Sequence, residues 1–401
     1  MSTKAIPTVK VSSRGRARVA SGHPWIYRQD VIAGPDRDAR NDGPAVVQVT
    51  DERNRPLAIA TWSLESPIAL RVLDREVKPQ ELPDFLKLVE ARLARAHARR
   101  ISLSLDRDAF RAVHGESDAL PGLFIDVYAH AAVMQTTSVA MNAHRSAIAA
   151  LAQRILGVRL VISRDDGSAR DFEGLPRNRG ILGGEGSSEI TYQLGPNLLT
   201  ADLMSDSKTG GFLDQAENHA LVAALAPAGA RCLDAFTYHG GFALALARKG
   251  GTVLATDDDA QAVARTTANA TRNGLSNMTA RQANAFDLLR SLEAEREQFD
   301  VVVLDPPALA KRKSGDSAAE RAYKEIILRG IRLTVPDGLL VACSCSGRVS
   351  REQFDSIIGE ASADSGRSVQ VLARMGAGRD HPELVGVPET GHLKCWVMRV
   401  L

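Results

Sequence analysis

RCLDAFTYHGGF, residues 231–242, decides the fold that this sequence predicts. A short apolar strand ends in an aspartate, and a turn with paired glycines, Gly240 and Gly241, then leads into a helical pattern. Glycines allow the backbone to approach a ligand closely at the carboxyl end of a strand, where open α/β sheets bind their ligands. The spacing is not GxGxxG, so a pyrophosphate cradle is disfavoured, and a tightly packed turn is the alternative interpretation.

Strand and helix patterns alternate around this turn, from about Thr191 onward. Short apolar runs separated by longer helical patterns indicate a parallel sheet with helices on both faces. The expected strands are RCLDAFTY, TVLATDDD, MTARQAN, FDVVVLDPP and GLLVACSCS. The expected helices are GGFALALARKG, AQAVARTTANATRNGL and AYKEIILRGIRLTV.

Residues 1–76 have a different pattern, in which short β runs are separated by turns. PAVVQVTDERNRPLAIATWS is typical of a hairpin with its turn around Asp51 to Pro56, and PIALRVLDRE follows as a further strand. The region carries little helix signal. We therefore expect a small β-barrel or a compact sheet module.

Residues 77–188 begin with a helical pattern, ELPDFLKLVEARLARAHARRISL. Its apolar positions recur every three and four residues, and arginines fill the opposite face, which we expect to be solvated. AAVMQTTSV and RLVISRDD are predicted strands around a helix, NAHRSAIAALAQRIL. The glycine-rich RGILGGEGSS, residues 179–188, is predicted to be a loop that separates this α+β region from residues 189–401.

The composition excludes several classes of protein. The chain has 401 residues, enough for two or three domains, and it lacks the run of ~20 apolar residues that crosses a membrane. The N-terminus has no apolar core of a secretory signal, so the cytoplasm is the expected compartment. The four cysteines are too sparse for a disulfide framework and lack CxxC spacing, so we expect reduced thiols and no metal site.

Two further predicted strands end in aspartates. Asp257 lies at the end of the predicted strand TVLATDDD, where a carboxylate can accept hydrogen bonds from both ribose hydroxyls of an adenosine ligand. The alternative is that these aspartates cap the N-terminus of the next helix, and this interpretation is preferred for Asp259. Asp305 ends FDVVVLDPP, and two prolines stiffen the exit of the strand. A carboxylate fixed there can bind the exchangeable protons of a base, although Asp-Pro is also an ordinary strand-to-loop junction.

Two of the four cysteines, Cys343 and Cys345, stand at the end of a predicted strand in LLVACSCSGRVS, residues 339–350. A disulfide between residues two apart would be strained, and a metal site would need two more ligands at suitable spacing. Both side chains lie on the same face of the strand.

Several motifs occur in one order along most of the chain. They are RGRARVASGHPWIY, VHGESDALPGLFIDVY, SDSKTGGFLDQAEN, FTYHGGFALALARKG, VLDPPALAKRK, AYKEI, CSCSG and DHPELVGVPETGHLKCWVMRV. Together they resemble class I S-adenosylmethionine-dependent methyltransferases, and closely the bacterial 23S ribosomal RNA cytosine-5 methyltransferases with an N-terminal PUA domain. The resemblance implies a PUA-like RNA-binding module at 1–76, a central α+β domain at 77–188 and a Rossmann-like methyltransferase domain at 189–401.

The resemblance also implies a chemistry for the thiols. Carbon 5 of a pyrimidine is a poor nucleophile, and a thiolate that adds at carbon 6 activates it toward the methyl group of S-adenosylmethionine. The family's nucleophile lies in the SCSG turn, which assigns this role to Cys345, whereas Cys343 is expected to be a small core residue. Asp305 is expected to orient the base. The implied cofactor-binding residues are Lys208, Thr209, Asp214, Gln215, Phe236, Tyr238, Gly240, Gly241, Asp257, Asn284, Asp305 and Pro306.

Three departures from the family pattern concern the adenine and base sites. Asn284 stands where an acidic residue is usual, the segment from Ala308 to Ala310 replaces a lysine and an aromatic residue, and His239 replaces a small hydroxyl residue. They leave two alternatives open. One is a methyltransferase of this fold that modifies a base nitrogen or another RNA, and the other is an RNA-binding assembly factor without catalysis.

Basic residues indicate where 23S ribosomal RNA, the expected partner, binds. The net charge is only +2, but the first twenty residues contain no acidic residue, and a nearly neutral chain can carry a basic face. The candidates are Lys10, Arg14, Arg16, Arg18, Lys311, Arg312 and Lys313, and Lys4 also adds to the positive charge of the first twenty residues. Trp25 and Tyr27 could stack on bases, although a place in the core of the β module is the preferred interpretation for Trp25. The oligomeric state is left open, with a homodimer as one alternative.

Overall fold

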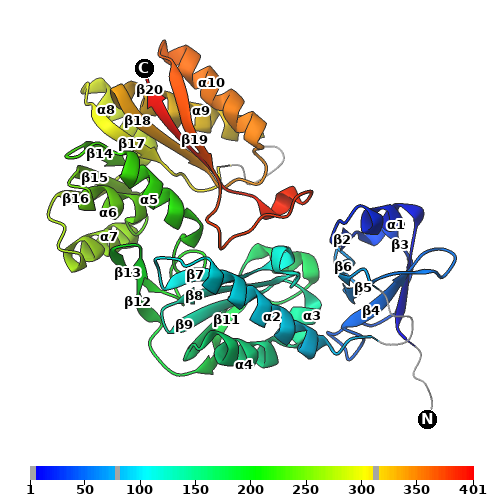
Figure 1. The fold of residues 1–401 in the computed structure, drawn as a ribbon. Helices are drawn as coiled ribbons and strands as arrows, with labels where there is room; N and C mark the ends of the chain where they lie inside the picture. The colour runs from blue at the N-terminus through cyan, green and yellow to red at the C-terminus, as the bar shows by residue number, and fades with distance from the viewer. Residues whose placement is uncertain (1–5, 77–81, 310–315) are drawn as a thin grey trace. The chain divides into compact units, whose positions relative to one another are not determined.

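The structure is a computed structural model that describes residues 6–76, 82–309 and 316–401 (Figure 1). The chain divides into two compact units. The first contains Met1–Ile190, Ala201–Gly210 and Pro382–Thr390, and the second contains Thr191–Thr200, Gly211–His381 and Gly391–Leu401. Five residues named above, Lys4, Ala310, Lys311, Arg312 and Lys313, lie outside the described residues.

The N-terminal part of the first unit contains a six-stranded sheet with the order β2-β6-β5-β4-β1-β3. Its strands are β1 (Thr8–Val11), β2 (Trp25–Ile26), β3 (Val31–Ala33), β4 (Val46–Thr50), β5 (Pro56–Trp62) and β6 (Leu70–Asp74). The expected hairpin is confirmed, because β4 and β5 pair antiparallel on either side of the predicted turn. Trp62, which is 2% exposed, lies in the core of this sheet.

One helix of this module was not expected from the sequence. α1 (Ser13–Ala20) follows β1, and the side chain of its N-cap, Ser12, accepts a hydrogen bond from the backbone of Gly15. Gly15 and Val19 are the buried residues of α1, so SRGRARVA has no apolar stripe to indicate a helix. Its place is instead fixed by arginine contacts to the buried Asp30, at the end of the short helical turn η1 (Arg28–Asp30).

The rest of the first unit contains a five-stranded sheet with the order β11-β10-β9-β8-β7. Its strands are β7 (Ala109–His114), β8 (Leu123–Tyr128), β9 (Ala131–Thr136), β10 (Leu160–Asp165) and β11 (Asn178–Gly184). Its helices and helical turns are α2 (Phe85–Ser102), α3 (Val139–Ala143), α4 (Arg145–Leu156), η2 (Gly115–Asp118) and η3 (Ser168–Glu173). The predicted strands and helices of this region are confirmed, and their apolar residues form one core.

Two expectations for this region are wrong. The glycine-rich segment is not a loop, because its first half forms the edge strand β11, which pairs antiparallel with β10. Glycine is required at Gly184, where φ is +81° and a Cβ would lie 1.7 Å from the carbonyl oxygen of Arg159. The arginines of α2 are also not all solvated: Arg92 and Arg100 are buried, and Arg100 donates two hydrogen bonds of 2.6 Å to Asp118.

The second unit is built on a seven-stranded sheet with the order β16-β15-β14-β17-β18-β20-β19 (Figure 1). Its strands are β14 (Arg231–Asp234), β15 (Thr252–Asp257), β16 (Met278–Gln282), β17 (Phe299–Leu304), β18 (Thr334–Ser344), β19 (Val369–Met375) and β20 (Lys394–Val400). The five predicted strands, β14 to β18, are parallel. β20 lies antiparallel between β18 and β19, an insertion that the sequence alternation did not predict. β12 (Glu189–Leu194) and β13 (Asn197–Asp202) form a separate two-stranded sheet.

Helices cover both faces of the seven-stranded sheet, as expected (Figure 1). They are α5 (Ala216–Leu225), α6 (Gly241–Arg248), α7 (Ala260–Arg272), α8 (Ala285–Ala294), α9 (Asp316–Leu333) and α10 (Arg351–Ser365), and the helical turn η4 (Leu213–Gln215) precedes α5. A further helical turn, η6 (Pro388–Thr390), belongs to the first unit. α8, α9 and α10 pack on one face, and α5 and α6 pack on the other. The expected helix AYKEIILRGIRLTV ends earlier than predicted, at Leu333, because Thr334 already pairs with Phe299 in the sheet.

The predicted fold class is confirmed: a Rossmann-like α/β domain is joined to an N-terminal β module and a small α+β region. In the described ranges, no helix is both long enough and apolar enough to span a lipid bilayer.

Candidate active site

The strand order of the large sheet reverses at β14, which lies between β15 and β17. These three strands are parallel, so their carboxyl ends meet at one edge, which is where open α/β sheets bind ligands. Asp234 ends β14, Asp257 ends β15, and Asp305 follows the last residue of β17. The structure thus brings the predicted residues Asp257 and Asp305 together with a third carboxylate, Asp234, for which the sequence predicted no role.

Asp257 is held in place by the backbone. Its carboxylate accepts hydrogen bonds from the N–H groups of Tyr238, at 2.8 Å, and Asp259, at 3.1 Å. A carboxylate has about four acceptor positions, so two ribose hydroxyls could be accommodated as well. Burial raises the pKa of Asp257 above its ordinary value. Asp259 caps α7, as predicted, by accepting a hydrogen bond from the backbone of Gln261 at 2.8 Å.

The turn between β14 and α6 is tightly packed. Tyr238 and Gly240 have positive φ angles of +47° and +90°. Thr266 of α7 donates a hydrogen bond of 2.6 Å to the carbonyl oxygen of Tyr238. A Cβ at Gly241 would lie 2.3 Å from the ring of His219, so glycine is required there. Packing alone therefore accounts for Gly241, while the backbone of the turn remains at the ligand-binding edge.

Asp234 is a strongly perturbed carboxyl group of this edge. It is 1% exposed, and its pKa is raised to about 7, chiefly by burial and also by the nearby Asp305 and Asp257. Its Oδ2 accepts a hydrogen bond of 2.8 Å from Thr237, whereas its Oδ1 has no hydrogen-bond partner among the described residues. An acidic, desolvated edge with an unsatisfied oxygen favours a ligand that carries positive charge. The sulfonium and amino groups of S-adenosylmethionine fit this requirement.

Asp305 is oriented by a short chain of side-chain amides. Gln215, at the end of η4, is 2% exposed and donates a hydrogen bond of 3.0 Å to Oδ2 of Asp305. Asn218 of α5 in turn donates a hydrogen bond of 2.6 Å to Oε1 of Gln215. Asp214, also predicted, is buried beside them, and its Oδ2 lies 3.4 Å from Nε2 of His392. The segment from Asp214 to Asn218 thus contributes directly to the carboxylate edge.

Cys343, in β18, and Cys345, directly after it, have different environments. Cys343 is 1% exposed and lies opposite Cys395 of β20, in the core beneath α5 and α6. Burial and the contact with Cys395 raise the pKa of Cys343 well above its ordinary value, so it remains a neutral core thiol, as expected. Cys345 lies just beyond the strand and is half-buried, which makes it the accessible thiol of the pair.

Two residues near Cys345 were not identified from the sequence. Tyr323 of α9 is fully buried and receives a hydrogen bond of 3.0 Å from the hydroxyl of Ser344. The pKa of Tyr323 is raised to about 12, chiefly by burial and also by the nearby Cys345 and Asp305. Lys394, the first residue of β20, is 2% exposed and binds the turn that contains Cys345. The sequence signal that could have indicated Lys394 is a lysine at the start of the otherwise apolar strand KCWVMRV.

The remaining predicted cofactor residues of the second unit are near the same strand ends. Phe236 packs against the core formed by α8, α9 and α10, and Pro306 is buried directly after Asp305. Asn284 is exposed and caps α8, and its side-chain oxygen accepts hydrogen bonds from the backbone of Phe286 at 3.0 Å and Asp287 at 3.3 Å. Because this oxygen is already engaged, an adenine contact by Asn284 would come from its amide N–H groups.

Lys208 and Thr209 belong to the first unit. Lys208 is exposed and has a φ of +53°. Thr209 is 2% exposed, donates a hydrogen bond of 2.7 Å to Asp126 of β8, and lies 3.0 Å from the hydroxyl of Tyr128. Their expected contact with the cofactor stays a prediction.

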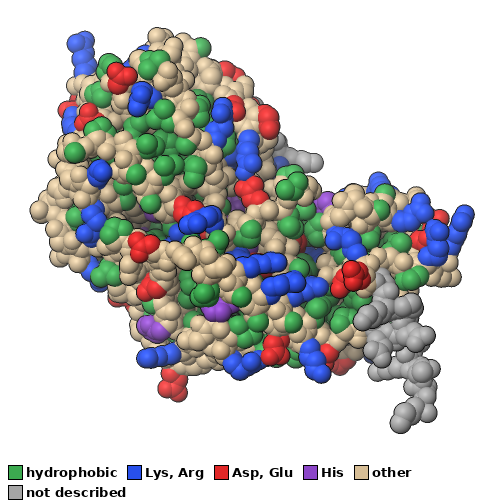
Figure 2. Space-filling model, in the orientation of Figure 1, with side chains coloured by type: hydrophobic (Ala, Val, Ile, Leu, Met, Phe, Trp, Pro, Cys, Tyr) green, Lys and Arg blue, Asp and Glu red, His purple; other side chains and the backbone are tan. Residues whose placement is uncertain are grey.

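The basic residues of α1 differ in how they are held. Arg14 and Arg18 donate to the buried Asp30, at 2.6 Å and 3.1 Å, and Arg18 also lies over the ring of Tyr27. Arg16 is exposed, and Figure 2 shows Lys and Arg side chains gathered on this N-terminal module. The prediction that Trp25 lies in the core of the β module is wrong. Trp25 is half-buried, and its indole donates a hydrogen bond of 2.8 Å to Glu116, outside the β module.

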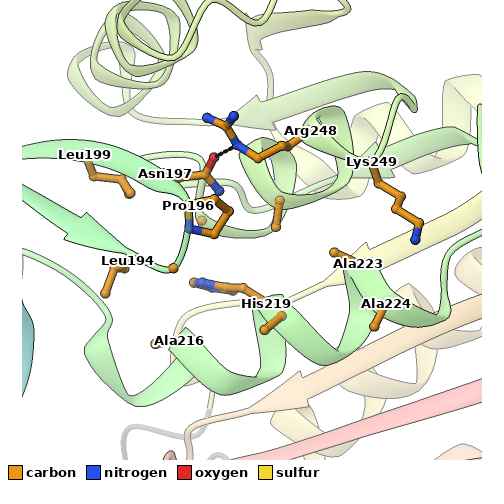
Figure 3. A pocket seen from close by; sticks show the side chains of 14 residues that line it. Leu194, Pro196, Asn197, Leu199, Ala216, His219, Ala223, Ala224, Arg248 and Lys249 are labelled. Atoms are coloured by element: carbon orange, nitrogen blue, oxygen red, sulfur yellow. Dashed lines mark hydrogen bonds between the residues drawn. The ribbon is translucent and has the colours of Figure 1, made fainter. Parts of the chain in front are cut away.

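A separate pocket of about 330 Å³ lies beside α5 and α6 (Figure 3). Its walls are mostly small apolar residues, including Ala216, Ala223 and Ala224, and the turn between β12 and β13 closes one side. Arg248 and Lys249 are its charged lining residues, and Arg248 donates a hydrogen bond of 2.7 Å to Asn197. Gly241, a predicted cofactor-binding residue, lines this pocket, whereas Asp234, Asp257, Asp305 and Cys345 do not. The pocket therefore lies beside the carboxylate edge rather than in it.

Comparisons with known proteins agree with this geometry. Residues 9–75 match a family described as PUA-like domain, and residues 227–377 match one described as methyltransferase domain. A ribosomal RNA large subunit methyltransferase I from Tolumonas auensis is 34% identical over 389 residues, which cover 94% of this chain and 96% of that protein. The chain belongs to this family. A member from Erwinia tasmaniensis is 32% identical and covers 98% of this chain and 99% of its own length.

Solved structures have the same fold. A putative S-adenosylmethionine-dependent methyltransferase from Streptococcus mutans has a TM-score of 0.80 at 18% identity, over 98% of this chain and 99% of that chain. A putative methyltransferase solved with SAH has a TM-score of 0.83 at 16% identity, over the same shares. The predicted fold class and family are confirmed. The expected cofactor, S-adenosylmethionine, agrees with the methyltransferase-domain match and with the ligands named for these two solved structures.

Proposed function

We propose that the protein transfers a methyl group from S-adenosylmethionine to carbon 5 of a cytosine in the 23S RNA of the large ribosomal subunit, with Cys345 as the nucleophile. One observation carries the proposal. The accessible thiol and Asp305 extend from the ends of two paired strands, since Leu304 of β17 is in register with Ala342 of β18. Asp305 also borders the carboxylate edge at β14 and β15, so one edge offers both a base site and a cofactor site.

The cofactor, when bound, supplies a methyl group on a positively charged sulfur. The Cys345 thiolate adds to carbon 6 of the cytosine, and the electrons of the ring double bond move to carbon 5. Carbon 5 forms the new bond to the methyl carbon, and the cofactor sulfur keeps the electron pair of the bond that breaks. A base then takes the proton from carbon 5, the bond between Cys345 and carbon 6 breaks, and its electron pair returns to the thiolate.

The carboxylates have separate roles in this scheme. Asp305, held by Gln215, accepts hydrogen bonds from the exocyclic amino group of the base and orients the ring over Cys345. Asp257 accepts hydrogen bonds from the ribose hydroxyls of the cofactor. Asp234 ends β14, between β15 and β17, and its Oδ1, which has no hydrogen-bond partner among the described residues, accepts a hydrogen bond from the cofactor's amino group. The turn from Phe236 to Gly241, with Asn284 and Asp214, completes the proposed cofactor site.

Three features support large-subunit ribosomal RNA as the substrate. The relatives named above are ribosomal RNA large subunit methyltransferases. The N-terminal module matches a PUA-like domain and carries the basic helix α1. A base in a duplex cannot reach the thiol, so the target is single-stranded or flipped out of its helix. A ribosomal RNA substrate also implies a cytoplasmic location.

The deciding experiment uses purified protein, S-adenosylmethionine and large-subunit RNA with the wild-type chain and Cys345→Ala. We expect 5-methylcytidine with the wild type and a loss of activity of at least about 10³-fold with the variant. RNA containing 5-fluorocytidine should form a stable adduct with the wild type, because fluorine cannot leave as a proton does. Full activity of Cys345→Ala would favour methylation of a nitrogen, and absence of cofactor binding would favour an assembly factor without catalysis.

A further inference from the structure

Lys394 is a buried lysine bound to the turn that contains Cys345. It begins β20 in register with Ser344 of β18 and is 2% exposed. Its Nζ donates hydrogen bonds to the carbonyl oxygens of Ser346 at 2.6 Å, Val349 at 2.8 Å and His392 at 2.9 Å. An ammonium group has three N–H donors, and each of these three carbonyls can accept one of them. Two of the three belong to the turn that follows Cys345.

The environment of Lys394 favours its charged form. Burial of an ammonium costs free energy, but three carbonyl dipoles directed at the nitrogen stabilise the positive charge. The nitrogen contacts the residue next to Cys345 in a region with little water. Charges interact more strongly in such a region than in water, and Ser346, whose carbonyl oxygen accepts from the ammonium, is bonded directly to Cys345.

The other titratable or charged groups around this turn do not replace that charge. Among the described residues they are Asp305 of β17, Tyr323 of α9, Cys343 of β18, His392 before β20, Arg348 in the turn, and Arg351 and Glu352 at the start of α10. Asp305 is a carboxyl group and offers no positive charge that could stabilise a thiolate. Tyr323 and Cys343 remain neutral, because burial raises the pKa of each. Arg348 is exposed and therefore screened by solvent.

We propose that Lys394 is a positioning residue of the methyl-transfer reaction: its buried ammonium fixes the turn after β18 and stabilises the thiolate of Cys345. The proposal rests on the proposed role of Cys345 as nucleophile. A free thiol has a pKa near ~8.5, so a nucleophile that works near neutral pH gains from a fixed neighbouring cation. Lys394 reaches only carbonyl oxygens in the contacts described above, and it acts through the turn rather than on the substrate.

The test separates the charge of Lys394 from its hydrogen bonds. Lys394→Arg keeps the charge, Lys394→Gln keeps N–H donors without charge, and Lys394→Met removes both. The rate of alkylation of Cys345 by iodoacetamide, measured across pH, gives the pKa of this thiol. Cys232, Cys343 and Cys395 are buried, so the alkylated peptide identified by mass spectrometry should be the one that contains Cys345. Cys345→Ser provides the blank.

We expect the pKa of Cys345 to rise by about one unit in Lys394→Gln and Lys394→Met, and to change little in Lys394→Arg. The pH dependence of kcat should move with it. Lys249→Met, at the exposed end of α6, removes a lysine far from the turn and should change neither quantity. An unchanged thiol pKa in Lys394→Gln would overturn the proposal, even if kcat fell. If Lys394→Met does not fold, comparison of Lys394→Gln with Lys394→Arg still shows whether the thiol pKa depends on the charge.

This outcome can be told apart from a failure of the proposed function. Alkylation reports on the thiol whether or not the protein methylates RNA. If Cys345→Ala retains activity, the nucleophile assignment is wrong, although Lys394 could still lower the pKa of the thiol. If Cys345→Ala is inactive and the thiol pKa does not depend on Lys394, the inference about Lys394 alone is wrong.

Discussion

The side-chain amide of Gln215 donates a hydrogen bond of 3.0 Å to the carboxylate of Asp305, ninety residues later in the chain. Gln215 is itself fixed by Asn218, so the orientation of Asp305 depends on a segment outside its own strand. This relationship gives the motif around residue 215 a physical role. Gln215 orients Asp305, the carboxylate proposed to hold the base. The role of Gln215 can therefore be tested separately, without changing Asp305.

Gln215→Leu should lower kcat/KM for RNA by about 10–100-fold, because Asp305 loses the donor that fixes its carboxylate. The affinity for S-adenosylmethionine, measured by calorimetry, should fall much less. Gln298→Leu is the matched control, since Gln298 is exposed at the opposite end of β17. Equal loss of cofactor affinity and of turnover in Gln215→Leu would indicate a role in the cofactor site instead.

Substitution of Cys343 and substitution of Cys345 should have opposite effects on activity and stability. Cys343→Ala should keep most of the activity and lower the free energy of unfolding by about 1–2 kcal/mol, because it leaves a small cavity in the core. Cys345→Ala should abolish methyl transfer with little change in stability, because the residue is half-buried at the end of the strand. Urea denaturation and a methylation assay on both variants check this pair. An active Cys345→Ala together with an inactive, stable Cys343→Ala would reverse the assignment.

Stability should depend on pH through Asp234. Its pKa is about 7 in the folded chain, against an ordinary value of 3.8, so between these values the folded state holds a proton that the unfolded state has lost. The free energy of unfolding should therefore fall as pH rises from about 4 to about 7, by up to about 4 kcal/mol for this group. Above pH 7 both states are ionised and the loss is complete.

Asp234→Asn provides the measurement for that prediction. The asparagine is neutral at every pH, so the difference in unfolding free energy between the wild type and Asp234→Asn should change over the same range. Urea denaturation at several pH values without cofactor would show it. A difference that stays constant from pH 4 to pH 8 would contradict a perturbed carboxyl group at this position.

Arg16 should contribute to RNA binding without contributing to stability. It is exposed on α1, whereas Arg14 and Arg18 bind Asp30. Arg16→Ala should lower RNA affinity by a few-fold, reduce the salt dependence of binding by roughly one phosphate contact, and leave the unfolding free energy unchanged. Filter binding at several salt concentrations checks this. The control is Arg281→Ala, which removes an exposed arginine of β16. An equal loss of RNA affinity in both variants would contradict a specific role of α1 in RNA binding.

Much of the fold could be predicted from the sequence because its signals are local. Alternating apolar runs and helical patterns in residues 231–346 indicate strand and helix types directly, and Asp257 and Asp305 stand where those strands end. α1 could not be predicted, because its stability comes from Asp30 rather than from an apolar stripe. The glycine-rich β11 was missed for a related reason, since pairing with β10 overrides its local loop propensity.

The sequence by itself determined the order of the elements, the class of the fold and the residues at the strand ends. Only the tertiary structure decided which groups share a desolvated site: Asp234 between two other carboxylates, Gln215 on Asp305, and Lys394 under the turn of Cys345. The reason is that backbone periodicity is a property of neighbouring residues. Burial and charge coupling depend instead on contacts between segments that are far apart in the chain.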